Sequence, residues 1–431
     1  MGAAGKDFHV FNTFYRNNSA YNVVCFTATQ IPGIESRPYP SVLSGKLYPN
    51  GIRIFPESKL SELVKKFDVH EVALAYSDLP FNYVMEKASL VESLDASFVL
   101  HGPKDFMIKS KKPVIAVTAV RTGCGKSQTS RKIAQLLLEH GKKVVVVRHP
   151  MPYGDLSKQI VQRFEKFEDF EKNKATIEER EEYERYVENG VVVFAGVDYE
   201  KILREAEKEC DVVIWDGGNN DLPFYVPDLH IVVADPLRPG HEVSYYPGMS
   251  NFLRAQVIVI NKMNSAKEND VKLVESNIKK FNPKAIVIKA DSILDVDKPE
   301  LIKGKAVLVV EDGPTLTHGG MTFGAGFVAA KKFSAKQIIE PQKYAVGSIK
   351  GVYKKYSHLK NILPAMGYST KQVKELEQTI NRSPADIVVS GTPINLGRIV
   401  NVNKEIVTVK YELAEKGKIT VESLLKKFKF F

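Results

Sequence analysis

The residues of this chain best suited to chemistry lie within VIAVTAVRTGCGKSQTSRKIAQLL, residues 114–137. The stretch predicts a buried strand, a turn containing Gly123 and Gly125, and a helix that opens at Lys126. A helix N-terminus offers unpaired N–H groups to an anion, and glycines let the backbone approach phosphate closely. The lysine then reaches the β- and γ-phosphates, and the Ser127 hydroxyl ligates Mg²⁺. We therefore predict a phosphate-binding loop, against the alternative of a plain glycine turn before a helix.

The start of this loop departs from the common pattern. G-x-x-x-x-G-K-[ST] has a glycine where this chain has Val120. Aligned by its final Gly-Lys-Ser, RTGCGKS resembles the loop K-G-G-x-G-K-[ST] of the SIMIBI class of P-loop proteins. The resemblance places Arg121 at the signature basic position, which in that class reaches phosphate, often from a neighbouring subunit. Thr122 stands where the class has glycine, so we leave open whether Arg121 acts in its own chain or across a homodimer.

Two carboxylates follow other predicted strands. DVVIWDGG ends on Asp216 and two glycines, which resemble the Walker B acid and switch glycine of that class. We predict that Asp216 is catalytic and shares Mg²⁺ with Ser127; the alternative is a helix cap. RHPMPYGDL brings Asp155 to the same sheet edge as Arg148 and His149. Asp155 is expected to orient water or the attacking group, unless it is a solvated loop acid.

The nucleotide base is left open by the sequence. VIVINKMN contains Asn261 and Lys262, the start of the guanine-reading pattern N-K-x-D, but Asn264 replaces the aspartate. An aspartate pairs with two N–H groups of guanine and an asparagine does not, so ATP and GTP both remain candidates. The predicted nucleotide-binding residues are Gly123, Cys124, Gly125, Lys126, Ser127, Gln128, Asn261 and Lys262.

Further strand ends are basic and rich in glycine, in the strings VADPLRPGHE, EDGPTLTHGGMTFGAG and GTPINLGRIV. Backbone N–H groups and guanidinium groups of this kind suit a substrate with several phosphates, although a purely structural loop is the alternative. The residues assigned to such a substrate are Arg148, His149, Asp235, Arg238, His318, Gly319, Gly320 and Arg398.

The elements that must position these residues alternate between Val/Ile-rich strands and helices, which predicts an α/β protein with a parallel sheet. We expect a Rossmann-like domain over 1–108, a SIMIBI-like P-loop domain over 109–335, and an α/β segment over 336–431 that packs on it. The highly charged stretch 163–189 predicts a solvated surface helix or lid, and a partner-binding coil is the alternative. The opening GAAG resembles a turn that follows a first strand, so either that strand is missing from this numbering or another fills the edge.

The overall composition argues against several classes of protein. The 431 residues carry a net charge of +10, with lysines spread among glutamates rather than gathered in a basic arm, so nucleic acid is not the expected partner. The three scattered cysteines fit neither a disulfide framework nor a zinc site. No signal peptide or membrane span is evident, and we expect a cytoplasmic protein.

Taken together, RTGCGKSQTSRK, RHPMPYGDL, EDGPTLTHGGMTFGAG and GTPINLGRIV resemble a family of archaeal and bacterial P-loop proteins regarded as GTPases and related to cyclic 2,3-diphosphoglycerate synthetase. The resemblance implies a dimeric enzyme in which ATP drives closure of an intramolecular phosphoanhydride. Two other functions stay open. One is a regulatory or assembly GTPase of the same class, and the other is a sensor that holds nucleotide without turnover.

Overall fold

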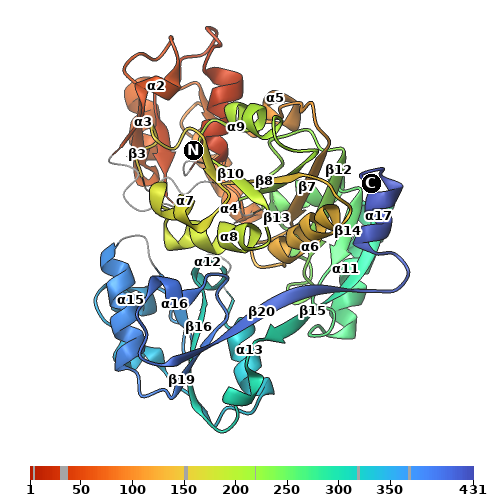
Figure 1. Cartoon of the computed structure of the whole chain (residues 1–431). Coiled ribbons are helices and arrows are strands. Elements are labelled where there is room, and N and C mark those ends of the chain that lie inside the picture. The colour runs from red at the N-terminus through yellow and green to blue at the C-terminus, as the bar shows by residue number, and fades with distance from the viewer. Residues whose placement is uncertain (3–4, 30–36, 150–153, 219, 318–320, 367–369) are drawn as a thin grey trace. The chain divides into compact units, whose positions relative to one another are not determined.

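The computed structural model describes residues 1–2, 5–29, 37–149, 154–218, 220–317, 321–366 and 370–431 (Figure 1). Two compact units share this chain. Unit 1 comprises Met1–Glu165, Val191–Ala290 and Glu415–Phe431, and unit 2 comprises Lys166–Gly190 and Asp291–Ala414. The boundaries of these two units differ from the boundaries of the three segments expected from the sequence. The three-segment division stays a prediction.

Unit 1 is built on a large and mostly parallel sheet. Its strand order is β9-β10-β8-β11-β7-β12-β14-β15, and only β9 is antiparallel to its neighbour. The central strands are runs of valine and isoleucine buried on both faces, as the parallel sheet predicted from the sequence requires. The strands span β7 Val114–Ala119, β8 Val144–Arg148, β9 Gln162–Phe164, β10 Val192–Ala195, β11 Val212–Gly217, β12 Leu229–Ala234, β14 Val257–Ile260 and β15 Ile286–Val296.

The N-terminal part of unit 1 contains short strands, with β1 (Phe26–Ala28) parallel to β3 (Ile52–Pro56) and β4 (Glu71–Ala73) parallel to β6 (Ser97–Val99). The strand β2 (Pro38–Tyr39) pairs with β3, and β5 (Leu79–Pro80) with β13 (Tyr245–Tyr246).

The first two residues connect these short sheets. Gly2 N donates to Thr27 O at 2.9 Å, the Met1 ammonium donates to Ala73 O at 2.6 Å, and Ala75 N donates to Met1 O at 2.8 Å. Met1 and Gly2 thus hydrogen-bond to residues of both short parallel sheets. Whether a first strand precedes the opening glycines stays a prediction.

One hydrophobic core joins this N-terminal part to the large sheet. Phe8 and Phe26 lie in the same buried cluster as Val145 and Trp215. The helices of unit 1 are α1 Lys6–Val10, α2 Ser41–Ser44, α3 Leu60–Phe67, α4 Phe81–Glu92, α5 Pro103–Phe106, α6 Lys126–Glu139, α9 Tyr199–Ala206, α10 Gly248–Arg254, α11 Glu268–Phe281 and α17 Val421–Lys427. Within the described residues, no helix is long and apolar enough to cross a membrane.

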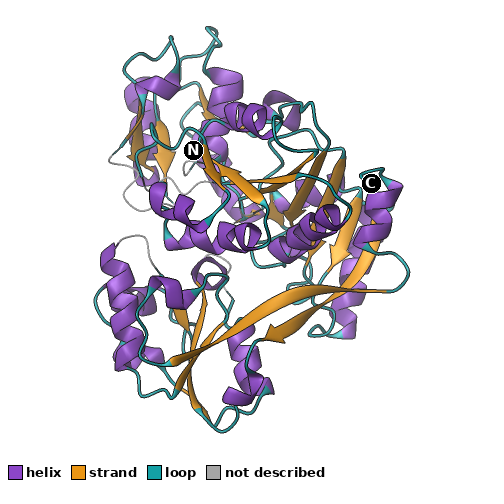
Figure 2. Cartoon of the chain, viewed as in Figure 1, coloured by secondary structure: helices purple, strands orange, loops and turns teal. Residues whose placement is uncertain are grey.

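Unit 2 has its own parallel strands, with β16 (Ala306–Asp312) between β17 (Gln337–Ile338) and β19 (Ile387–Ser390), and β20 (Glu405–Lys416) beyond β19. The short strand β18 (Leu363–Ala365) also pairs with β16. Figure 2 shows helices flanking these strands. They are α7 Phe167–Lys172, α8 Ile177–Glu188, α12 Gly313–Thr317, α13 Ala325–Lys332, α14 Ser348–Lys355, α15 Thr370–Arg382 and α16 Leu396–Ile399.

The charged helix α8 corrects one expectation. A solvated surface helix was predicted, yet Glu178, Glu179, Glu181 and Glu184 are all buried. Some of their oxygens have donors: the Thr176 cap engages Glu179, and the Thr392 hydroxyl donates to Oε1 of Glu181 at 2.7 Å. Buried carboxylates are tolerated where such donors exist, and a sequence pattern rich in glutamate does not reveal them.

Candidate functional site

The phosphate loop, residues 120–127, connects β7 to α6 in unit 1. Gly123 and Gly125 have φ of +82° and +104°, in the left-handed region that favours glycine. A β-carbon added at Gly125 would also collide with Nδ2 of Asn261. The helix α6 begins at Lys126, so the loop presents the N-terminus of this 14-residue helix. The predicted local structure of the loop is therefore present.

Lys126 and Asp216 form the centre of the site. Helix α6, which begins at Lys126, follows strand β7, and β7 is the neighbour of β11, which carries Asp216. Nζ of Lys126 lies 2.8 Å from Oδ1 of Asp216, which also accepts from Ser130 Oγ at 2.7 Å. The Arg148 guanidinium donates to the other carboxylate oxygen. Asp216 is fully buried; burial raises its pKa, but the charges of Arg148 and Lys126 outweigh this and lower it below its ordinary value.

Asn261 and Lys262, the residues predicted to contact the base, hold the backbone of the phosphate loop. Nδ2 of Asn261 donates to Cys124 O at 3.0 Å, and Nζ of Lys262 donates to Gly123 O at 2.6 Å. Each satisfies a loop carbonyl and so stabilises the left-handed turns. Contact with a base stays a prediction for both residues.

Asp235 supports the loop from the end of β12. Its carboxylate is buried and lies 2.8 Å from Lys262 Nζ and 3.1 Å from Arg238 Nη2. Burial raises the pKa of Asp235, and the two cations lower it by more. Arg238 also donates to Thr122 O at 2.8 Å and contacts the Cys124 sulfur at 3.4 Å. Arg238 thus contacts the phosphate loop directly, and Asp235 is linked to the loop through Arg238 and Lys262. The role of both residues toward substrate stays a prediction.

Arg121 is enclosed by groups of its own chain. Its Nε donates to Asp78 Oδ1 at 2.5 Å, and Nη1 lies 2.9 Å from Nδ1 of His241. The guanidinium carbon lies 3.8 Å from the centre of the Tyr245 ring, a cation–π contact. Arg121 is 8% exposed, and these contacts are with residues of its own chain. Its action within the chain or across a homodimer stays a prediction.

His149 is buried at the same edge of the sheet. Its Nε2 lies 3.2 Å from the Asp221 carboxylate, and its ring packs where a β-carbon at Gly5 or Gly218 would collide with it. Gly218 follows Asp216 by two residues, so His149 lies beside the predicted switch turn.

Some predicted residues are not brought to this centre. Asp155 is exposed, and its carboxylate accepts from Ser157 N at 3.0 Å rather than contacting the described part of the phosphate loop. Arg398 belongs to unit 2, where its guanidinium lies 4.0 Å from the centre of the Phe167 ring. His318, Gly319 and Gly320 lie outside the described residues.

The structure adds residues that the sequence did not single out. Asp78 pairs with Arg121, and Ser130 hydrogen-bonds Asp216. Ser130 is four residues after Lys126 and thus on the same helix face, a spacing that could have indicated it. Asp78 comes from a distant part of the chain, and no local pattern indicates its partner.

The predicted magnesium ligands fit the ion in chemical type. A hydroxyl from Ser127 and an ionised carboxylate from Asp216 are hard oxygen donors, which Mg²⁺ prefers alongside water and phosphate oxygens. Oδ1 of Asp216 accepts from Lys126 and Ser130, so a metal would share or replace those contacts. Among the residues that the structure describes, no cluster of three or more His, Cys, Asp or Glu side chains suits a metal.

Comparison with known sequences gives one full-length match. The Arginine synthetase ArcE of Thermococcus kodakarensis is 63% identical over 428 residues, which are 99% of this chain and 96% of that protein. A family model described as "Type III restriction enzyme, res subunit" matches residues 85–217, the stretch with the phosphate loop and Asp216.

Solved structures resemble the chain only weakly. LpxK from Aquifex aeolicus in complex with ATP is 13% identical, covering 86% of this chain and 100% of that one with a TM-score of 0.45. HypB from Helicobacter pylori in complex with nickel is 14% identical, covering 48% and 86%, with a TM-score of 0.26. Both TM-scores are below 0.5, so neither structure indicates the function of this chain.

Proposed function

Because the chain belongs to the family of the arginine synthetase ArcE, we propose that it is a nucleotide-dependent synthetase that makes arginine. The observation that carries the proposal is 63% identity along 99% of the chain. The loop geometry supports it, since a helix N-terminus, Lys126 and Asp216 lie together as phosphoryl transfer requires.

The chemistry of the product suggests the acceptor. Citrulline differs from arginine in carrying a ureido oxygen where arginine has a guanidine nitrogen. We propose that this oxygen attacks the γ-phosphorus of ATP or GTP, and the bond to the nucleoside diphosphate breaks. Ammonia then adds to the activated carbon and phosphate leaves with the ureido oxygen. The products are arginine, inorganic phosphate and the nucleoside diphosphate, so atoms and charge balance.

The residues of the phosphate loop would act by position and charge. Lys126 and the backbone N–H groups at the start of α6 would bind the phosphates and stabilise charge on the transferring group. Ser127 and Asp216 would hold Mg²⁺, which when bound neutralises phosphate charge. Arg148 keeps Asp216 ionised, and Arg121 is placed at the loop start by Asp78. A homodimer is part of the proposal, although Arg121 is already enclosed within its own chain.

A cyclic 2,3-diphosphoglycerate synthetase-like ligase is the second candidate. The four strings that resemble that family favour it, and its reaction also begins with phosphoryl transfer from a nucleotide to an oxygen. A regulatory GTPase is favoured by the Asn261-Lys262 pair alone. A sensor without turnover would bind nucleotide and release no phosphate.

The test is to incubate the full chain with Mg²⁺ and either ATP or GTP, adding citrulline with ammonium or 2,3-diphosphoglycerate. ³¹P NMR would follow phosphate products, and amino-acid chromatography would follow arginine. Arginine formed in step with phosphate release, and lost in Lys126→Ala, is the expected result. A cyclic anhydride signal would favour the second candidate. Nucleotide hydrolysis at a rate that neither citrulline nor 2,3-diphosphoglycerate changes would favour the GTPase. No turnover of either nucleotide would favour the sensor.

A further inference from the structure

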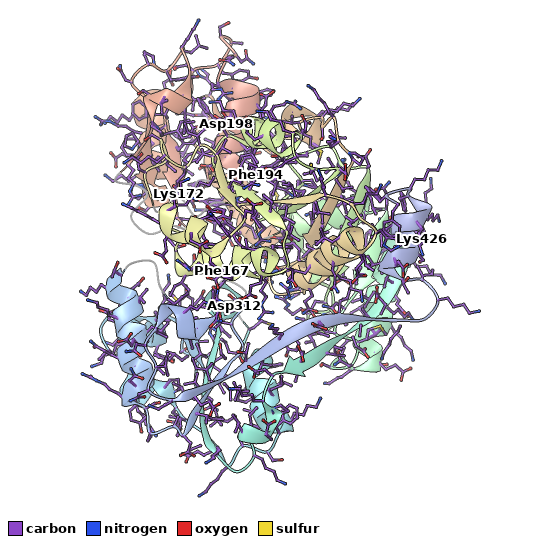
Figure 3. The ribbon with its side chains drawn as sticks, in the orientation of Figure 1. Phe167, Lys172, Phe194, Asp198, Asp312 and Lys426 are labelled. Atoms are coloured by element: carbon purple, nitrogen blue, oxygen red, sulfur yellow. The ribbon has the colours of Figure 1, made fainter. Side chains whose placement is uncertain are left out.

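A group of buried acids lies at one edge of the unit 2 sheet. Glu311 and Asp312 end β16, and Thr392 follows the neighbouring strand β19, so these residues share the carboxyl edge of parallel strands. Figure 3 labels Asp312 at this end of β16. Ligands of α/β proteins commonly bind at this edge, outside the ends of the strands.

Glu181 of helix α8 completes this group. Its Oε1 accepts a hydrogen bond of 2.7 Å from the hydroxyl of Thr392, a residue that is fully buried. Glu181 is itself 6% exposed, and its carboxyl lies within hydrogen-bonding reach of the Asp312 carboxyl. When both acids are ionised, Oε2 of Glu181 accepts no hydrogen bond from the described residues.

The neighbouring acids differ from Glu181 because donors reach them. Glu311 accepts from Phe327 N at 2.8 Å at the start of α13. Glu184 accepts from Arg180 Nη1 at 3.1 Å and from Asn395 N at 3.3 Å. Glu181 differs in that its carboxyl faces the carboxyl of Asp312.

Two carboxyls that face each other in a buried site disfavour the state in which both are ionised. Burial, and then the charge of Asp312, raise the pKa of Glu181 well above its ordinary range, with a smaller contribution from Glu178 one turn earlier. Such a pair shares a proton unless a cation lies between the oxygens. A cation with several N–H donors would replace this contact by charge-assisted hydrogen bonds.

We propose that Glu181 and Asp312 bind the nitrogen cation of arginine synthesis, which is the ammonium co-substrate or the guanidinium group of the product. The inference rests on the proposed function and adds a second binding site to it. Thr392 orients Glu181 through its hydroxyl, and Arg185 fixes the same turn by donating to Pro393 O at 3.0 Å.

The test uses Glu181→Gln in the full chain, which keeps the shape of the side chain and removes its charge. Glu188→Gln is the matched control, since Glu188 lies on the same helix and is exposed. Isothermal titration with L-arginine, and steady-state kinetics with ammonium chloride as the varied substrate, separate the two cations. We expect at least a tenfold loss in arginine affinity or a tenfold rise in the KM for ammonium in Glu181→Gln alone, with ADP and GDP affinity unchanged.

The outcomes separate this inference from the proposed function. If the wild type forms arginine and Glu181→Gln matches it in both arginine affinity and ammonium KM, the cation site is wrong and the synthetase stands. If the wild type forms no arginine and binds neither cation, both proposals fail. Asp312→Asn provides a second variant should Glu181→Gln unfold, and it is expected to show the same selective loss.

Discussion

Nζ of Lys126 lies 2.8 Å from Oδ1 of Asp216, and the Arg148 guanidinium contacts the opposite oxygen of the same buried carboxylate. One anion between two cations leaves a net positive charge beside the phosphate loop. A positive potential at a helix N-terminus attracts polyphosphate and keeps Asp216 ionised. Lys126, Asp216 and Arg148 therefore form the electrostatic centre of the site.

Lys126→Ala should lower the turnover number about 100-fold or more, because one charged donor to the transferring phosphoryl group is lost. Lys132→Ala is the control on the same helix, where Nζ of Lys132 lies 3.6 Å from the Glu415 carboxylate. Phosphate release in the presence of Mg²⁺ and nucleotide measures the effect. An equal loss of turnover in both variants would show that the effect comes from disturbing helix α6 and not from losing a contact with phosphate.

Asp216→Asn should lower the free energy of unfolding at pH 7 by about 3 kcal/mol, since two buried cations lose their counter-charge. The folded pKa of Asp216 is lowered, so its stabilisation is complete above the ordinary aspartate pKa of about 3.9 and is lost as the pH falls below that value. Urea unfolding at pH 7, 5 and 3 should therefore show a difference between wild type and variant that shrinks only at the lowest pH. A difference that is constant over this range would contradict the assignment.

Arg121→Ala and Asp78→Asn should each destabilise the protein, because each leaves a largely buried charge without its ion-pair partner. Combined in one chain, the two changes should cost less than their sum by about 1 to 3 kcal/mol. Chemical denaturation of the four proteins in this cycle measures that coupling. Additive effects would mean that the short contact contributes nothing to folding.

Gly125→Ala should abolish nucleotide binding, because the added β-carbon meets Asn261 at a φ of +104°. Gly141→Ala is the matched control: its φ is +72°, but nothing lies within 4 Å of the added atom. Both changes carry the backbone strain of a left-handed residue, so both should lose about 1 kcal/mol of stability. Calorimetric titration with ATP and GTP should then distinguish them, and similar affinities in the two variants would rule out the proposed collision.

The elements of the fold were largely predictable from local patterns. Val/Ile runs predicted β7, β8, β11, β12 and β14, and Gly-Lys-Ser predicted the start of α6. The partners of charged residues were not predictable. Asp78 lies 43 residues before Arg121, and Thr392 lies 211 residues after Glu181. Helix α8 has the composition of an exposed helix, and the sequence gives no sign that Thr392, the donor to its buried Glu181, lies against it.

The route of the chain through the two units sets how the protein can be taken apart. The polypeptide leaves unit 1 after Glu165, returns at Val191, leaves again after Ala290 and returns at Glu415. The strands β15 and β20 each continue from one unit into the other. No single terminal truncation therefore yields either unit whole. A free-standing unit 2 would require a new peptide link between Gly190 and Asp291, and unit 1 would require its three segments to be rejoined, so dissection of this protein calls for redesigned connections rather than shortened genes.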